Sequence, residues 1–224
     1  MSKNVSAIFA HPDDEVLGCG ATLARYADEG DKVHILILAT GLTSRGDTTI
    51  AQIEQLKSDA QRSADVLGAD TIEFADFPDN RMDTVALLDV VQRTEAFIST
   101  NSPDLLYTHF AADLNIDHRI VAEAVTTALR PQPGLNPPQL LACEVNSSTE
   151  WTVSPSPVFQ PNEYVVVNQY LQTKIDALAC YSSELRDAPH PRSKEGVRTL
   201  AHWRGSQIGH KAAEAFMSLR KVSI

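Results

Sequence analysis

Positive charge is scarce in this sequence of 224 residues, which carries 19 lysines and arginines against 29 aspartates and glutamates and has a formal net charge of −10. No stretch combines basic residues with interleaved aromatic ones, so we expect no nucleic-acid partner. No apolar run is long enough to span a bilayer, and the first four residues lead directly into a predicted strand without a signal-peptide pattern. These absences favour a cytoplasmic protein with no membrane span.

Cysteine is also rare, and the chain contains only Cys19, Cys143 and Cys180. They are odd in number, widely spaced and without a Cys-x-x-Cys pair, which indicates reduced, mostly buried thiols. The remaining composition, with 43% hydrophobic and 21% charged residues, is ordinary for a globular protein. We therefore expect a single domain over residues 1–224 with a sizeable core.

Short apolar runs alternate with longer segments of helical periodicity. Strands are predicted at residues 5–10, 33–39, 71–77, 105–109 and 140–145, and helices at residues 15–30, 50–67, 83–99 and 118–129. Gly68 is a plausible C-cap of the second of these helices. The alternation predicts an α/β, Rossmann-like fold, with a mostly parallel sheet of about five strands and helices on both faces.

The C-terminal third has a weaker pattern. An extra edge strand is predicted at residues 163–167, and helices are predicted at residues 169–185 and 206–219. The intervening segment 186–198 holds two prolines and mixed charges. We expect this segment to form a mobile rim or lid.

Residues 10–15 read Ala-His-Pro-Asp-Asp-Glu and directly follow the first predicted strand. Charged groups leave water at such a place only when they are paired, hydrogen-bonded or bound to a metal. His11 and Asp14 can both point into one crevice, and an imidazole with a carboxylate suits Zn²⁺. Asp13 lies between them, where a general base for a metal-bound water is expected. In parallel sheets, ligands bind beyond the carboxyl ends of the strands, which is where this motif falls.

A simpler interpretation is that the same string begins a helix. Pro12 in a first turn, followed by carboxylates against the positive end of the helix dipole, is typical of helix N-termini. For any one of these residues alone, capping is the more common role. The whole string after a strand is more specific, so we favour the metal site.

The string resembles the opening motif of the zinc-dependent de-N-acetylase family of LmbE-like and PIG-L proteins. The resemblance runs along most of the chain and is strongest at residues 10–15 and 117–118. It implies a hydrolase that removes an acetyl group from an N-acetylated amino sugar or a conjugate of one, with Asp13 as the general base. It further implies that residues 150–224 form the substrate side of the domain.

Zinc needs a third protein ligand to complete the usual catalytic set, and we predict His118. An aspartate–histidine pair before a helix is as often a cap as a ligand. His118 follows the fourth predicted strand, however, and the family that this sequence resembles carries a zinc-binding histidine here. Fe²⁺ or Co²⁺ could replace Zn²⁺, because nitrogen and oxygen ligands do not choose strongly among these ions.

The sequence departs from the His-x-Asp-His pattern of many family members, because Asn115 stands at the first position. Asparagine can donate a hydrogen bond to a developing oxyanion but supplies no titratable proton at neutral pH. His109 could supply an imidazole from elsewhere, although a histidine hydrogen-bonded to the backbone at the strand end is equally plausible. Asp117 could orient His109 or His118, or cap the helix.

Several further residues are weaker candidates. Arg45 and Arg81 could hold a polar or anionic part of the substrate, although surface arginines are common. Asp79 and Asn80 could bind hydroxyls, although a turn explains them equally well. Packing is the predicted role of a last group: Gly18, Cys19, Gly20, Trp203, Arg204, Gly205, Gly209, Glu214 and Phe216.

Two other functions remain open from the sequence. A related amidase would use the same metal to cleave a larger amide in a sugar or thiol conjugate. A Rossmann-like binding module would hold a small ligand without turnover, although such a module has no use for a base beside a metal. A homo-oligomer is possible in each case.

Overall fold

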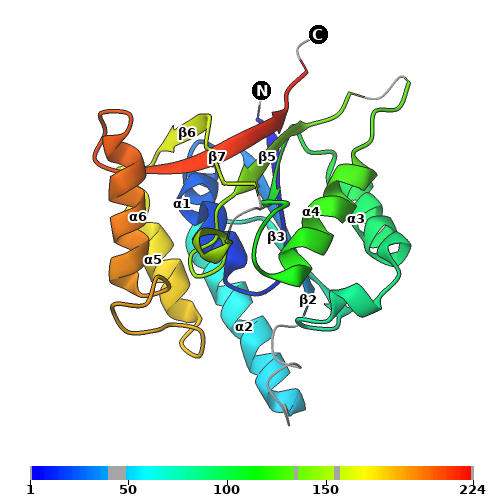
Figure 1. The fold of residues 1–224 in the computed structure, drawn as a ribbon, viewed down its shortest axis with the longest axis horizontal. Coiled ribbons are helices and arrows are strands. Elements are labelled where there is room, and N and C mark those ends of the chain that lie inside the picture. Colours follow the sequence, from blue (N-terminus) through cyan, green and yellow to red (C-terminus); the bar gives the residue numbers. More distant parts are fainter. Residues whose placement is uncertain (1, 40–48, 134–135, 154–156, 223–224) are drawn as a thin grey trace.

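The structure, a computed structural model, describes residues 2–39, 49–133, 136–153 and 157–222 (Figure 1). The described strands form one sheet in the order β3 (Thr71–Phe77), β2 (Lys32–Ala39), β1 (Asn4–Phe9), β4 (Leu105–His109), β5 (Gln139–Cys143), β7 (Ala213–Arg220) and β6 (Glu163–Val166). The first five strands of the chain pair in parallel, whereas β7 is antiparallel to both β5 and β6.

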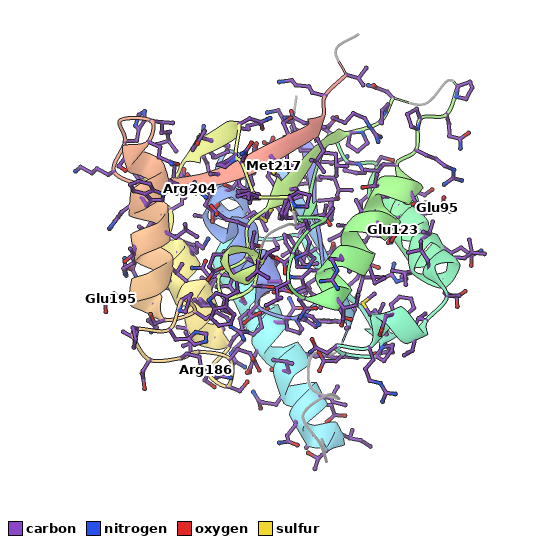
Figure 2. All side chains as sticks on the ribbon, viewed as in Figure 1. Glu95, Glu123, Arg186, Glu195, Arg204 and Met217 are labelled. Atoms are coloured by element: carbon purple, nitrogen blue, oxygen red, sulfur yellow. The ribbon has the colours of Figure 1, made fainter. Side chains whose placement is uncertain are left out.

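Helices cover both faces of this sheet (Figure 1). The described helices are α1 (Asp14–Asp28), α2 (Ile50–Leu67), α3 (Leu87–Asn101), α4 (Ile116–Ala128), α5 (Leu171–Cys180) and α6 (Lys194–Ser206). One apolar cluster joins α1, α2 and α5 to the sheet, and a second joins α3 and α4 to it. In Figure 2, Glu95 and Glu123 mark α3 and α4, on the side of the molecule away from Glu195 and Arg204 of α6. The predicted α/β fold with helices on both faces is confirmed.

The predicted helix at 206–219 is wrong, since Ala213–Arg220 forms strand β7. Alanine, glutamate, methionine and leucine favour a helix by intrinsic propensity. Here the segment lies between β5 and β6 and pairs with both, and such tertiary pairing overrides propensity. The sheet therefore has seven strands in the described part of the chain rather than about five, and β6 confirms the predicted edge strand.

Part of the segment 186–198, for which a mobile rim or lid is predicted, is helical in the structure. Its last residues belong to α6, which begins after Ser193, whose side chain accepts a hydrogen bond from the Gly196 N–H. The other predicted helices are confirmed with shifted ends, because α3 begins at Leu87 and α5 ends at Cys180. Gly68 is confirmed as the left-handed C-cap of α2.

Helix α1 packs tightly on the sheet because it carries glycine at position 18. A Cβ atom there would lie 3.0 Å from the Phe9 ring and 3.1 Å from the Cys143 Cβ. The predicted packing role of Gly18 is therefore confirmed. Cys19 and Cys143 are buried free thiols and Cys180 is a partly exposed one, as expected. Among the described residues, no helix combines the length and apolar character needed to cross a bilayer.

A buried ion pair stabilises a kink in α1. Cys19 leaves helical geometry (φ −148°, ψ 18°), which frees backbone groups on both sides of it. The Glu214 carboxylate accepts hydrogen bonds from the N–H groups of Ala21 (3.2 Å) and Thr22 (2.7 Å). Lys174 donates to Glu214 (2.5 Å) and to the Leu17 carbonyl (2.8 Å), both buried. Strand β7 and α5 thus supply the bonds that the kinked helix lacks.

We expect Glu214→Ala to lower the free energy of unfolding by about 3–5 kcal/mol, because it leaves the buried Lys174 charge unpaired. Urea denaturation followed by circular dichroism measures this change. Glu29→Ala is the matched control, since it removes an exposed ion pair with Arg25 on the same helix and costs below about 1 kcal/mol. Equal effects of the two substitutions would contradict the role of Glu214.

Candidate functional site

The candidate site lies where the order of the parallel strands reverses. β2 and β3 follow β1 on one side, whereas β4 and β5 lie on its other side. Ligands of such sheets bind beyond the carboxyl ends of the strands at this point. A cavity of about 110 Å³ lies there, lined by the loops after β1, β3, β4 and β5, by Leu56 of α2, and by Glu184 and Arg192.

Three predicted metal ligands converge in this cavity. Asp14 Oδ2 lies 3.2 Å from His11 Nδ1 and 3.2 Å from His118 Nε2. One ligand atom from each residue lies within 4.8 Å of those of the other two. Ligand atoms at about 2.0–2.1 Å from a tetrahedral ion lie about 3.3 Å apart, so the donor set fits Zn²⁺ or a similar ion.

A carboxylate holds the second ring nitrogen of each histidine. His11 Nε2 lies 3.0 Å from Asp117 Oδ2, which leaves Nδ1 directed at Asp14. The Asp117 carboxylate also accepts hydrogen bonds from the N–H groups of Asn80 (2.6 Å) and Met82 (3.0 Å). Such partners fix the orientation of a metal-binding imidazole and raise its basicity. The sequence predicted that Asp117 orients His109 or His118. In the structure, Asp117 contacts His11 instead.

His118 has a corresponding anchor that sequence reasoning missed. Its Nδ1 lies 3.1 Å from Asp113 Oδ1, a buried carboxylate that accepts hydrogen bonds from the hydroxyls of Ser148 and Thr149 and from the Asn115 N–H. The hydroxyl partners follow β5, far from Asp113 in sequence, so local patterns give no signal for this network. Asp113 fixes the direction of the His118 ring.

The site holds more negative charge than its own residues balance. Burial lowers the pKa of His11, but hydrogen bonds to Asp117 and Asp14 outweigh it and raise the pKa to about 10. Burial likewise opposes the charge of His118, and the neighbouring Asp14 and Asp113 carboxylates raise its pKa to about 9. Both imidazoles thus retain a proton that a metal cation would replace. The electrostatics therefore favour cation binding.

A second group of possible ligands shares His11 with Asp79 and Asp117. His11 Nε2 lies 3.3 Å from Asp79 Oδ1 and 3.0 Å from Asp117 Oδ2. The Asp117 carboxylate already accepts two backbone hydrogen bonds, so this group is a hydrogen-bonded anchor for the ring. The set of His11, Asp14 and His118 is the better metal site.

Asp13 does not cap α1, although it occupies the N-cap position. Its backbone is left-handed (φ 98°), which is uncommon for a residue with a side chain, and its carboxylate makes no cap hydrogen bond. The carboxylate instead faces Arg192, whose Nη1 donates to Asp13 Oδ2 at 3.3 Å. Burial raises the pKa of Asp13, the Asp14 charge raises it further, and Arg192 opposes both. The capping interpretation therefore fails for this side chain.

Arg192 and Glu184 line the cavity and were not among the predicted site residues. Arg192 Nη1 lies 3.9 Å from Glu184 Oε2, so the arginine lies between Glu184 and Asp13. Among the described residues that line the cavity, Arg192 is the one arginine, and none is a lysine. A charged residue directly after Pro191 in the predicted rim was the available signal, but nothing in the sequence places it opposite Asp13.

Asn115 lines the cavity and also begins α4. Its Oδ1 accepts the Asp117 N–H at 2.8 Å, and its Nδ2 donates to Asn80 Oδ1 at 3.0 Å. His109, in contrast, is fully buried and absent from the cavity lining. Its Nε2 accepts the Ala10 N–H at 2.8 Å, and its ring stacks on His118 with centroids 3.8 Å apart. His109 therefore has the backbone-bound arrangement that the sequence left open.

The predicted substrate-binding residues separate in space. Asp79 and Asn80 line the cavity after β3. Arg81 is exposed and does not line it, because the chain turns away into the short 3-10 turn at residues 82–84. Arg45 lies outside the described residues. The structure thus brings Asp79 and Asn80, but not Arg81, to the metal ligands.

Comparison with known proteins gives consistent matches. A sequence model of the family described as GlcNAc-PI de-N-acetylase (PIG-L) matches residues 6–129. An uncharacterized deacetylase, YaiS of Escherichia coli K12, is 31% identical over 186 residues, which are 81% of this chain and 91% of that protein. The diacetylchitobiose deacetylase of Thermococcus kodakarensis is 25% identical over 95% of this chain and 81% of its own length.

A solved structure also matches the fold. The 4-carboxy-2-hydroxymuconate hydratase GalB of Pseudomonas putida KT2440 superposes with a TM-score of 0.81 at 20% identity, covering 99% of this chain and 98% of that one. At this identity the likeness shows the fold alone, and its different chemistry warns against transferring an activity from the fold. The match over residues 6–129 and the similarity to YaiS show that the chain belongs to the GlcNAc-PI de-N-acetylase (PIG-L) family.

Proposed function

We propose that the protein is a metal-dependent hydrolase that removes the acetyl group from an N-acetylated amino sugar or a conjugate of one. One observation carries this proposal: Asp13 is a buried carboxylate that makes no helix cap and lines the same cavity as three convergent metal ligands. A carboxylate that is not used as a helix cap and lies beside a metal site is the arrangement that a hydrolytic base requires. The relatives named as deacetylases support this choice.

His11, Asp14 and His118 are the residues that would hold the ion, which we expect to be Zn²⁺, with Fe²⁺ or Co²⁺ as alternatives. Such an ion, when bound, activates a water molecule and polarises the amide carbonyl as a Lewis acid. Asp117 and Asp113 hold the two imidazoles in position for it.

Asp13 moves the proton in this mechanism. It accepts a proton from the attacking water as the new carbon–oxygen bond forms at the acetyl carbonyl. It then delivers that proton to the nitrogen as the carbon–nitrogen bond breaks, so that acetate and a primary amine leave. Arg192, at 3.3 Å from Asp13 Oδ2, orients the carboxylate within the cavity.

Asn115 is the proposed donor to the oxyanion that develops during attack. It lines the cavity, and the amide group carries two N–H donors, of which one bonds to Asn80. The geometry gives His109 no part in this step, because its ring lies outside the cavity lining. Asp79 and Asn80 are proposed to bind hydroxyl groups of the sugar.

The first test measures primary amine and acetate released from a panel of N-acetylated sugars, free, nucleotide-linked and thiol-linked, with zinc-loaded and chelated protein in parallel. We expect equal amounts of amine and acetate from at least one sugar, and none after chelation. Amine without acetate would indicate the alternative of a larger amide. Hydration of an unsaturated dicarboxylate, with no amine from any sugar, would contradict the proposal.

Asp13→Asn should lower kcat by about 10²–10⁴-fold while the protein still binds its metal, because the amide cannot accept the proton. Steady-state kinetics and metal analysis of the same preparation measure both quantities. Asp83→Asn, at an exposed position away from the cavity, is the matched control and should keep full activity. Full activity of Asp13→Asn would exclude it as the base.

Asp113→Asn should weaken metal affinity by about 10–100-fold, because it removes the negative partner of His118. Competition with a chromogenic chelator measures the affinity. In the wild-type protein, the affinity should also fall as the pH is lowered, since protons compete for His11 and His118. An unchanged affinity in Asp113→Asn would show that the carboxylate does not support the ligand.

A further inference from the structure

Glu15 is a buried carboxylate that the mechanism above does not use. It is the second residue of α1, where a glutamate can stabilise the helix dipole while facing solvent. Here it is only 1% exposed, and it does not line the catalytic cavity. Burying a carboxylate costs several kcal/mol unless hydrogen bonds compensate, so an apolar residue would suit a purely packing position better. Packing alone therefore does not explain Glu15.

The two oxygens of the Glu15 carboxylate have different partners. Glu15 Oε2 accepts the backbone N–H of Asp13 at 3.1 Å. Glu15 Oε1 accepts the hydroxyl of Tyr181 at 2.5 Å. Tyr181 directly follows α5 and is fully buried, and it does not line the cavity either. Glu15 thus connects the end of α5 to the residue that we propose as the base.

Tyr181 also reaches the opposite side of Asp13. Its carbonyl accepts the Glu184 N–H at 3.0 Å, and Glu184 Oε2 lies 3.9 Å from Arg192 Nη1. Arg192 in turn donates to Asp13 Oδ2 at 3.3 Å. The contact on the Asp13 N–H and the contact on its carboxylate therefore both lead back to Tyr181.

Asp13 needs such support because its backbone is strained. A φ of 98° is costly for a residue with a side chain and persists only when the surroundings impose it. A general base must lie within hydrogen-bond reach of the proton that it abstracts. Relaxation of this backbone would move the carboxylate, and a displacement of about 1 Å can cost about 10²-fold in rate. The contacts of Asp13 therefore bear on turnover as well as on folding.

We propose that Tyr181 is a positioning residue for Asp13 and acts through Glu15. The inference rests on the proposed function for the role of Asp13 as the base. The hydrogen bond from Tyr181 fixes the Glu15 side chain, whose Oε2 holds the Asp13 N–H and so keeps the Asp13 carboxylate directed into the cavity. Tyr181 lies beyond the family match at residues 6–129, so the C-terminal part of the chain contributes to the placement of the base.

Tyr181→Phe should lower kcat about tenfold and change KM and metal affinity less than about twofold, because it loosens the base but keeps the buried ring and the metal ligands. Steady-state kinetics use the sugar of the panel above that zinc-loaded wild-type protein hydrolyses fastest. Tyr107→Phe is the matched control: it also removes the hydroxyl of a fully buried tyrosine, one that contacts only the Tyr26 hydroxyl at 3.4 Å. A tenfold loss in both variants, or in neither, would overturn the inference.

Substitutions of Glu15 separate its hydrogen bonds from its charge and its bulk. Glu15→Gln keeps an oxygen for the Asp13 N–H and an amide that can donate to the Tyr181 oxygen, so it should keep kcat within about threefold. Glu15→Ala removes both bonds and should lower kcat about 10²-fold. Equal losses in the two variants would show that the bonds do not position the base.

Hydrogen exchange of the Asp13 amide, followed by NMR, tests the inference without turnover. We expect Tyr181→Phe and Glu15→Ala to speed this exchange about tenfold and Tyr107→Phe to leave it unchanged. Faster exchange in protein that hydrolyses none of the sugars would support the placement of Asp13 by Tyr181 and contradict the deacetylase. Unchanged exchange, or faster exchange with unchanged kcat in protein that does hydrolyse a sugar, would overturn the positioning role.

Discussion

Buried negative charge is the constraint on which this site depends. Asp14, Asp113 and Asp117 are all at most 4% exposed, and their ion-pair partners in the described part of the chain are three histidines, His11, His109 and His118. Removing a carboxylate from water costs several kcal/mol unless hydrogen bonds and opposite charge compensate. Backbone N–H groups and hydroxyls supply the first part of this compensation. A divalent cation held by the proposed ligands His11, Asp14 and His118 would supply the second.

The position of Asp13 follows from that constraint. The turn from β1 to α1 must bring His11 and Asp14 to one point, and the intervening backbone then adopts φ 98° at Asp13. A residue with a side chain in such a conformation costs roughly 1–3 kcal/mol and persists only when its surroundings impose it. Arg192 on one side and the Glu15 carboxylate on the Asp13 N–H, at 3.1 Å, impose it here. This strained backbone conformation therefore directs the Asp13 carboxylate toward the cavity. Without it, the carboxylate would cap the helix.

The sequence was sufficient where local patterns carry the information. The strand-then-helix order predicted the parallel core, and the spacing from His11 to Asp14 together with the resemblance predicted three residues that do converge. It was insufficient where tertiary contacts decide, as in β7, whose helix-favouring residues pair with β5 and β6. Asp113 and Arg192 were missed for the same reason, because Ser148 lies 30 residues or more from its partners and Arg192 lies 179 residues from Asp13.

In the proposed function, the chemistry lies in the first part of the chain, and we propose that the C-terminal part contributes to substrate selection. The family match over residues 6–129 contains the three proposed metal ligands and Asp13, whereas Arg192, which also lines the cavity, lies beyond it. Trp203 lies beyond it as well and is 59% exposed, so it does not have the packing role expected from the sequence. Glu214 of β7 joins the parts, because its carboxylate bonds the Ala21 and Thr22 N–H groups in the helix that begins at the catalytic turn. The loops of the C-terminal segment can then vary in sequence to fit another substrate, while the buried hydrogen bonds of Glu214 keep α1 in place.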